Sequence, residues 1–137
     1  MSAPLEGRVA LVTGSSRGIG AGIVKKLAAD GARVVVNYHK NSQAADEVVA
    51  AINSQREGAA IAVMADASTI AGGETLLTAC MRAFGRIDIL VLNAGVMVAG
   101  ALNDVVDSVF DATFNIHVKG PLFLAKAAAV HLQEGTP

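Results

Sequence analysis

The stretch that decides the fold is Arg8–Gly20, which reads RVALVTGSSRGIG. Its first part, Arg8–Thr13, is a short apolar and β-branched run typical of a buried strand. A glycine-rich turn follows, and from Ile19 onward the apolar residues recur at the spacing of a helix. A turn without Cβ atoms lets a pyrophosphate approach the free N–H groups at the start of a helix. The strand–turn–helix unit therefore predicts a phosphate site, the alternative being a glycine turn that only saves space.

The rest of the chain repeats this alternation of short strands with longer helical segments. Apolar on successive residues, as expected where helices cover both faces of a parallel sheet, the strands are expected at Arg8–Thr13, Arg33–Asn37, Ala60–Ala65 and Ile87–Asn93. The helical pattern predicts helices at Ile19–Asp30, Ser42–Glu57 and Glu74–Phe84, and a further helical region from about Asp104 with a kink at Pro121. The expected fold class is α/β, a Rossmann-type doubly wound parallel sheet.

Composition narrows the possible partners and location. The chain has 137 residues, of which 53% are hydrophobic and 17% charged, so we expect one folded domain. A net charge of −1 argues against binding nucleic acid through overall charge. No charge-free run is long enough to cross a bilayer, and the first residues lack the pattern of a secretory signal. With Cys80 as its one cysteine, the chain suits a reducing compartment, and we expect a cytoplasmic protein with no membrane partner.

Four motifs follow one another along the chain. They are Thr13-Gly14-x-x-x-Gly18-x-Gly20, Asp66 just after the third strand, Asn93-Ala94-Gly95 at the end of the fourth strand, and Asn115. In this order and spacing, from residue 7 to about residue 133, they resemble the short-chain dehydrogenase/reductase family. The chain departs from the family at Leu92, which replaces the first Asn of the NNAG motif. Locally the sequence is similar to acyl-carrier-protein ketoreductase-like members.

This resemblance implies an oxidoreductase that transfers a hydride between a nicotinamide cofactor and a small carbonyl or alcohol substrate. It implies that the glycines bind the pyrophosphate, that Asp66 lies beside the adenine, and that Asn115 is catalytic through a water in the proton relay. The residues expected to bind the cofactor are Gly14, Ser16, Arg17, Gly18, Ile19, Gly20, Asn37, Tyr38, Lys40, Asp66, Asn93, Ala94 and Gly95. No metal site is expected. Because the family commonly assembles through the helix that Asn115 begins, a homo-oligomer is expected.

The end of the second strand predicts the choice of cofactor. An NAD-preferring site needs Asp or Glu there for the ribose 2′-hydroxyl, whereas Asn37 is neutral. Lys40 and, in the glycine turn, Arg17 are cations that could bind a 2′-phosphate. We therefore predict NADP(H), the alternative for both cations being an ordinary solvated surface position.

The Tyr-x-x-x-Lys pair that the family uses as general acid/base has no match in these 137 residues. Tyr38 is the one tyrosine, and the residue four positions later is Ser42. Lys119 could approach the cofactor, although a surface lysine is the simpler interpretation. His117, two residues after Asn115, is expected to point roughly the opposite way. The 137 residues are therefore expected to be inactive alone.

Three functional classes remain to be compared. The preferred one is a single NADP(H)-binding domain over residues 1–137, truncated relative to the family and incomplete at the C-terminal side of its sheet. In that sheet Ile87–Asn93 would be an unpaired edge strand. The alternative is a non-catalytic nucleotide-binding or interaction protein. A Rossmann-like methyltransferase is disfavoured because such folds usually have an acidic residue where this chain has Asn37.

Overall fold

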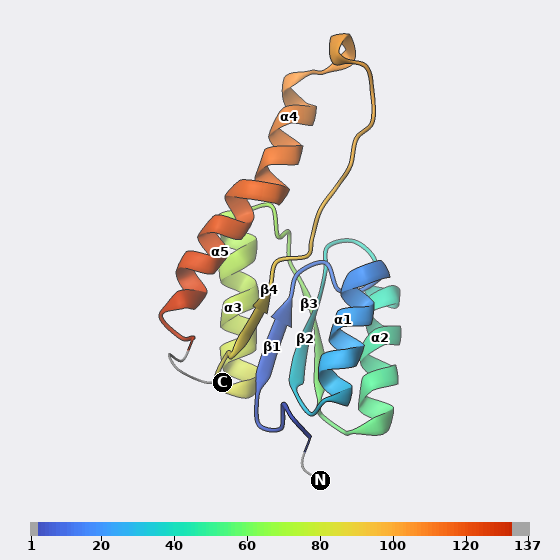
Figure 1. Cartoon of the computed structure of the whole chain (residues 1–137), viewed down its shortest axis with the longest axis vertical. Coiled ribbons are helices and arrows are strands. Elements are labelled where there is room, and N and C mark those ends of the chain that lie inside the picture. Colours follow the sequence, from blue (N-terminus) through green and yellow to red (C-terminus); the bar gives the residue numbers. More distant parts are fainter. Residues whose placement is uncertain (1–2, 133–137) are drawn as a thin grey trace.

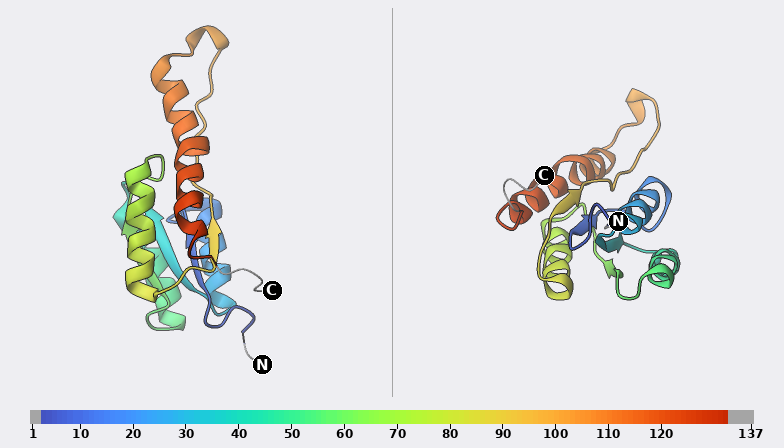
Figure 2. Two further views of the ribbon diagram at one scale, coloured as in Figure 1. Left: turned by 90° about the vertical axis from the view of Figure 1, so that its left-hand side faces the viewer. Right: turned by 60° about the horizontal axis from the view of Figure 1, so that its bottom comes forward.

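The structure, a computed structural model, describes residues 3–132 and has a parallel sheet at its centre (Figure 1). The strands are β1 (Val9–Val12), β2 (Arg33–Tyr38), β3 (Ala60–Met64) and β4 (Ile89–Val91), in the order β3-β2-β1-β4. One face of the sheet is covered by α1 (Gly18–Ala29) and α2 (Ser42–Gln55), and the other by α3 (Ile70–Phe84) and α5 (Gly120–Ala129) (Figure 2). The expected α/β class and the doubly wound parallel sheet are confirmed.

The strand order reverses beside β1, and this reversal determines where a site can form. Leu11 in β1 pairs with Val35 in β2 on one side and with Leu90 in β4 on the other. All three strands run the same way, so their carboxyl ends meet at one edge of the sheet. In open α/β sheets ligands bind outside this edge, at the point where the order reverses.

The core consists of two apolar clusters, one on each face of the sheet. Along β1 the side chains alternate, with Ala10 and Val12 in the cluster beneath α1 and α2, and Val9 and Leu11 in the cluster beneath α3 and α5. Helices cover both faces, so the strand is apolar at every position, as expected. Cys80 is fully buried in the second cluster, and burial, with a smaller effect from Asp88, raises the pKa of its thiol to about 11.

Two elements differ in length from the sequence-based expectation. The third helix begins at Ile70 rather than Glu74, because the Thr69 hydroxyl accepts a hydrogen bond from the Gly72 N–H at 2.9 Å and caps the helix. The glycines of its first turn hid this start from a search for apolar periodicity. The fourth strand, expected over Ile87–Asn93, pairs with β1 only over Ile89–Val91.

The region after β4 is not one kinked helix. A 3-10 turn (Leu102–Asp104) precedes α4 (Asp107–Phe114), and a π-helical turn (Asn115–Lys119), below called the π turn, joins α4 to α5. Pro121 lies in the first turn of α5. Proline has no N–H to continue an α-helical ladder, and the wider π turn accommodates this gap in place of the expected kink. Figure 1 shows α4 extending beyond the carboxyl edge of the sheet.

No helix in residues 3–132 is both long and apolar enough to cross a membrane.

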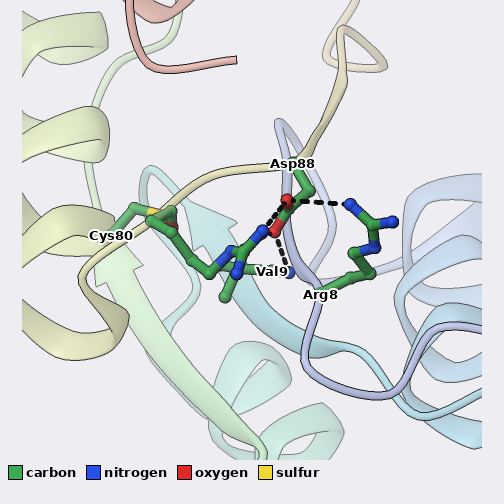
Figure 3. Close-up of polar contacts among 5 residues, drawn as sticks. Arg8, Val9, Cys80 and Asp88 are labelled. Carbon is green, nitrogen blue, oxygen red and sulfur yellow. Dashed lines mark hydrogen bonds and ion pairs between the residues drawn. The ribbon is translucent and has the colours of Figure 1, made fainter. Parts of the chain in front are cut away.

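The opposite edge of the sheet is held by an ion cluster around Asp88 (Figure 3). The carboxylate accepts hydrogen bonds from the Val9 N–H at 2.9 Å and from Arg86 Nε at 2.8 Å, and it contacts Arg8 at 3.4 Å. Its side chain is only 3% exposed. Burial raises the pKa of Asp88, but the hydrogen bonds from Arg86 and Val9, together with the positive charge of Arg86 and the contact from Arg8, outweigh it and hold the pKa below its usual range. Asp88 thus joins the start of β1 to the chain entering β4.

We expect Asp88→Asn to lower the free energy of unfolding by about 2 kcal/mol at pH 7, because a buried charge-assisted contact is lost. The folded-state pKa is depressed, so this stabilisation is present above the unfolded pKa of about 4 and is lost as the pH falls through the folded value. Urea denaturation of both proteins at pH 7 and pH 3.5 should show the difference shrinking at the lower pH. Asp46→Asn, on the exposed side of α2, is the matched control. An equal difference at both pH values would contradict the assignment.

Candidate functional site

The glycine turn between β1 and α1 is fixed from the β2 side by the Asn37 side chain. Asn37 Oδ1 accepts a hydrogen bond from the Gly14 N–H at 2.8 Å. Its Nδ2 donates toward carbonyl oxygens at the ends of β2 and β3, at 3.1 to 3.3 Å, those of Tyr38, Val63 and Ala65. Asn37 is 2% exposed. Every polar atom of this side chain is therefore used within the protein.

This geometry corrects the role expected for Asn37. The prediction that its side chain faces a ribose 2′ group is wrong, because the amide points beneath the glycine turn and is buried. The side chains that reach the surface at the end of β2 belong to the next residues, with Tyr38 half-buried and His39 and Lys40 exposed. Spacing alone identified the end of the strand but not the direction of its last inward side chain.

From the β4 side the turn is fixed by Thr13 and Asn93. The Thr13 hydroxyl accepts hydrogen bonds from the N–H groups of Asn93 and Ala94, both at 3.0 Å. Asn93 Nδ2 donates in return to the carbonyl oxygens of Thr13 and Gly14, at 3.0 and 3.1 Å. Ser15 adds a link to β2, since its hydroxyl accepts from the Asn37 N–H at 2.9 Å. Sequence analysis did not single out the hydroxyls of Thr13 and Ser15, which are buried donors and acceptors rather than surface groups.

Two of the three glycines are required by close packing. A Cβ on Gly14 would lie 2.9 Å from Ala94 Cα, and Gly14 also has a φ of +62°. A Cβ on Gly20 would lie 2.5 Å from Asn93 Nδ2. Gly18 differs, because its φ is +56° but a Cβ there would meet nothing within 4 Å. The first two positions thus keep the turn close to β4, and Gly18 leaves open space in front of it.

The helix that follows the turn presents backbone donors without partners. Its first intrahelical bond runs from the Ala21 N–H to the Arg17 carbonyl at 3.2 Å. The N-cap residue Arg17 makes no side-chain capping bond, so the N–H groups of Gly18, Ile19 and Gly20 precede the helical ladder. Such an end attracts anions through its free donors and its dipole. Ser16 is half-buried, and Arg17 and Ile19 are exposed at the same place.

Asp66 is held at the same edge, in the segment after β3. Its carboxylate accepts from the Ser68 N–H at 3.0 Å and the Ser68 hydroxyl at 2.6 Å. Partial burial raises the pKa of Asp66, but these hydrogen bonds and the charges of His39 and Lys40 outweigh it and keep the pKa below its usual value. An ionised acid therefore stands near the two basic residues that follow β2.

The structure thus brings most of the expected cofactor-binding residues to one edge of the sheet. Asn115 belongs to the π turn instead, and within residues 3–132 its side chain makes no hydrogen bond. His117, to which sequence analysis gave no part in the site, reaches the segment after β4, with its Nε2 2.7 Å from the Val96 carbonyl oxygen. No spacing rule pointed to this contact, because it depends on the π turn.

Comparisons with known proteins agree with this geometry. The family model for short chain dehydrogenase matches residues 8–136. An uncharacterized oxidoreductase of Methylorubrum extorquens is 47% identical over 96% of this chain and 52% of its own length. A probable tetrahydroxynaphthalene reductase of Zymoseptoria tritici is 44% identical over 96% of this chain and 49% of its own. The chain therefore spans about half the length of these relatives.

A solved structure gives the same result for the fold. The crystal structure of a short chain dehydrogenase from Burkholderia cenocepacia, in complex with NADP, superposes with a TM-score of 0.92 at 46% sequence identity. The match covers 96% of this chain and 53% of that one.

We expect Asn37→Asp to lower the free energy of unfolding by about 3 kcal/mol, because a carboxylate cannot donate to the carbonyl oxygens that now receive the amide N–H groups. Urea denaturation followed by circular dichroism at pH 7 measures the loss. The matched control is Asn41→Asp at the exposed N-cap of α2, where Asp caps as well as Asn and stability should change little. Full stability of Asn37→Asp, with a shift of cofactor preference toward NADH, would instead return this side chain to the cofactor.

Proposed function

The chain belongs to the short-chain dehydrogenase family, and from this premise we propose that it binds NADP(H) at the carboxyl edge of its sheet. In this proposal it forms the nucleotide-binding part of an oxidoreductase acting on a carbonyl or alcohol substrate. The observation that carries the proposal is the glycine turn, which is tied to β2 and β4 by buried hydrogen bonds while the first N–H groups of α1 stay without partners. These donors and the helix dipole are suited to a pyrophosphate.

The preference for a 2′-phosphate rests on charge. Between Tyr38 and Ser42 the chain presents His39 and Lys40 and no acid, and Arg17 is exposed in the glycine turn. A 2′-phosphate placed here would accept charge-assisted hydrogen bonds, whereas the 2′-hydroxyl of NAD would find no carboxylate partner. With Asn37 buried, the argument now depends on the cations. The NADP bound by the Burkholderia cenocepacia protein supports the same choice.

The remaining contacts follow from the edge of the sheet. We assign Asp66 to the adenine end, where its carboxylate is held by Ser68 and balanced by the charges of His39 and Lys40. Ile19, 79% exposed beside the turn, offers an apolar surface for the cofactor. The segment Asn93-Ala94-Gly95 would line the opposite side, held by Thr13.

NADP(H), when bound, supplies or accepts the hydride. The described residues bind and orient it, and Asn115 remains the candidate to hold a water for proton transfer. A general acid/base in the form of Tyr-x-x-x-Lys is not found among the 137 residues, where Tyr38 is the one tyrosine. The relative described as a probable tetrahydroxynaphthalene reductase supports a fused-ring phenolic ketone as the substrate class of the whole protein.

We also propose a homo-oligomer and a cytoplasmic location. Apolar side chains are exposed along α4 and α5, with the rings of Phe110 and Phe114 stacked 4.3 Å apart and each about half exposed. Such a surface is typical of a protein interface. The buried free thiol of Cys80 supports a reducing compartment.

NADPH should bind more tightly than NADH, and Arg17→Ala and Lys40→Ala should each weaken NADPH binding roughly tenfold by removing a charge-assisted hydrogen bond. NADH affinity should change little in both variants. Fluorescence titration of each nucleotide measures the affinities, and Lys25→Ala, exposed farther along α1, is the control. Equal affinities for the two nucleotides in the unsubstituted chain would contradict the proposal.

The 137-residue chain should bind NADPH without reducing a fused-ring aromatic ketone at a measurable rate. The physical reason is the missing acid/base pair, without which the alkoxide formed by hydride transfer has no proton donor. NADPH oxidation followed by absorbance at 340 nm, with and without the ketone, tests this. Ketone-dependent turnover that is lost in Lys119→Ala would contradict it and assign that lysine a catalytic role.

A further inference from the structure

The π turn lies between two segments of the candidate site. On one side Gly120, the first residue of α5, is buried where a Cβ would collide with the Ala67 carbonyl oxygen, next to Asp66. Farther along α5, Leu124 and Ala128 are buried in the cluster shared with α3. The base of the π turn is therefore fixed by core packing against the segment that carries Asp66.

On the other side His117 reaches the segment that follows β4. Its Nε2 lies 2.7 Å from the Val96 carbonyl oxygen and 3.2 Å from the Val96 nitrogen. The shorter distance favours the tautomer in which Nε2–H donates to the carbonyl. A Cβ on Gly95 would lie 2.6 Å from His117 Cε1, so the absence of a side chain at this position makes room for the ring.

The segment has few other attachments. Asn93 and Ala94 are bound to Thr13, but residues 95–100 are exposed and have no regular secondary structure. Within residues 3–132, the contact with His117 provides the only hydrogen bonds of the stretch from Gly95 to Gly100. The path of the chain as it leaves the glycine turn therefore depends on a side chain of the π turn.

We propose that His117 is a positioning residue that holds the segment Asn93–Val96 against the glycine turn. It acts through the Val96 backbone and touches no reacting atom. The π turn thereby connects the segment after β3, through Gly120, with the segment after β4, through His117. The effect on nucleotide affinity rests on the proposed function, whereas the effect on the segment itself does not.

The test compares His117→Leu with His117→Gln in the 137-residue chain. Leu has similar bulk and no donor. The Gln amide reaches a similar distance and can both donate to the Val96 carbonyl and accept from its N–H, which a single ring nitrogen cannot do at once. His131→Leu, the same substitution at an exposed histidine beyond α5, is the matched control.

Hydrogen–deuterium exchange of the apo protein is the first measurement. In His117→Leu, exchange across residues 94–98 should rise about fivefold, while exchange in β1 and α1 stays unchanged. His117→Gln should restore the protection. NADPH titration is the second measurement, and His117→Leu should weaken binding about threefold with recovery in His117→Gln.

Unchanged exchange at residues 94–98 in His117→Leu would overturn the proposal. An equal loss in the Leu and Gln variants would also overturn it, because ring volume rather than the hydrogen bond would then be responsible. Absence of NADPH binding by the unsubstituted chain would contradict the proposed function alone, and the exchange measurement would still decide the role of His117.

Discussion

The buried amide of Asn37 is the interaction on which the site depends. Its oxygen receives the Gly14 N–H, and its nitrogen faces carbonyl oxygens at the ends of β2 and β3. A side chain with both a donor and an acceptor is needed here, because a buried carbonyl or N–H left without a partner costs about 1–3 kcal/mol. Neither a carboxylate nor an apolar residue could satisfy both sets of backbone groups.

The same logic continues across β1. Thr13 receives two N–H groups from the segment after β4, and Asn93 donates back to the turn. The buried hydrogen bonds on these two flanks hold the turn at the point where the strand order reverses. The next N–H groups, at the start of α1, are left without a protein partner. The structure therefore separates residues that build the turn from residues that face a ligand, and this separation is what makes the edge suitable for a dinucleotide phosphate.

Much of this could be predicted from the sequence, because the signals were local. Helical periodicity located α1 and α2, and the apolar runs located the strands within one to three residues at each end. The order β3-β2-β1-β4 came from the family resemblance and is confirmed. Local signals failed where a side chain's direction depends on distant partners. Asn37 was placed at the end of β2, but only the tertiary fold shows that it points inward. His117 was set aside because regular helical geometry turns it away from Asn115, and the π turn changes that geometry.

The central claim, that the free N–H groups of α1 receive the phosphates of NADP(H), is tested most directly by nuclear magnetic resonance. In a ¹⁵N-labelled sample titrated with NADPH, the amides of Gly18, Ile19 and Gly20 should show the largest shifts. The Gly14 amide, already bonded to Asn37, should move less. Largest shifts in the apolar groove between α1 and α2, lined by Ala28, Ile52 and Arg56, with little change at Gly18–Gly20, would contradict the account.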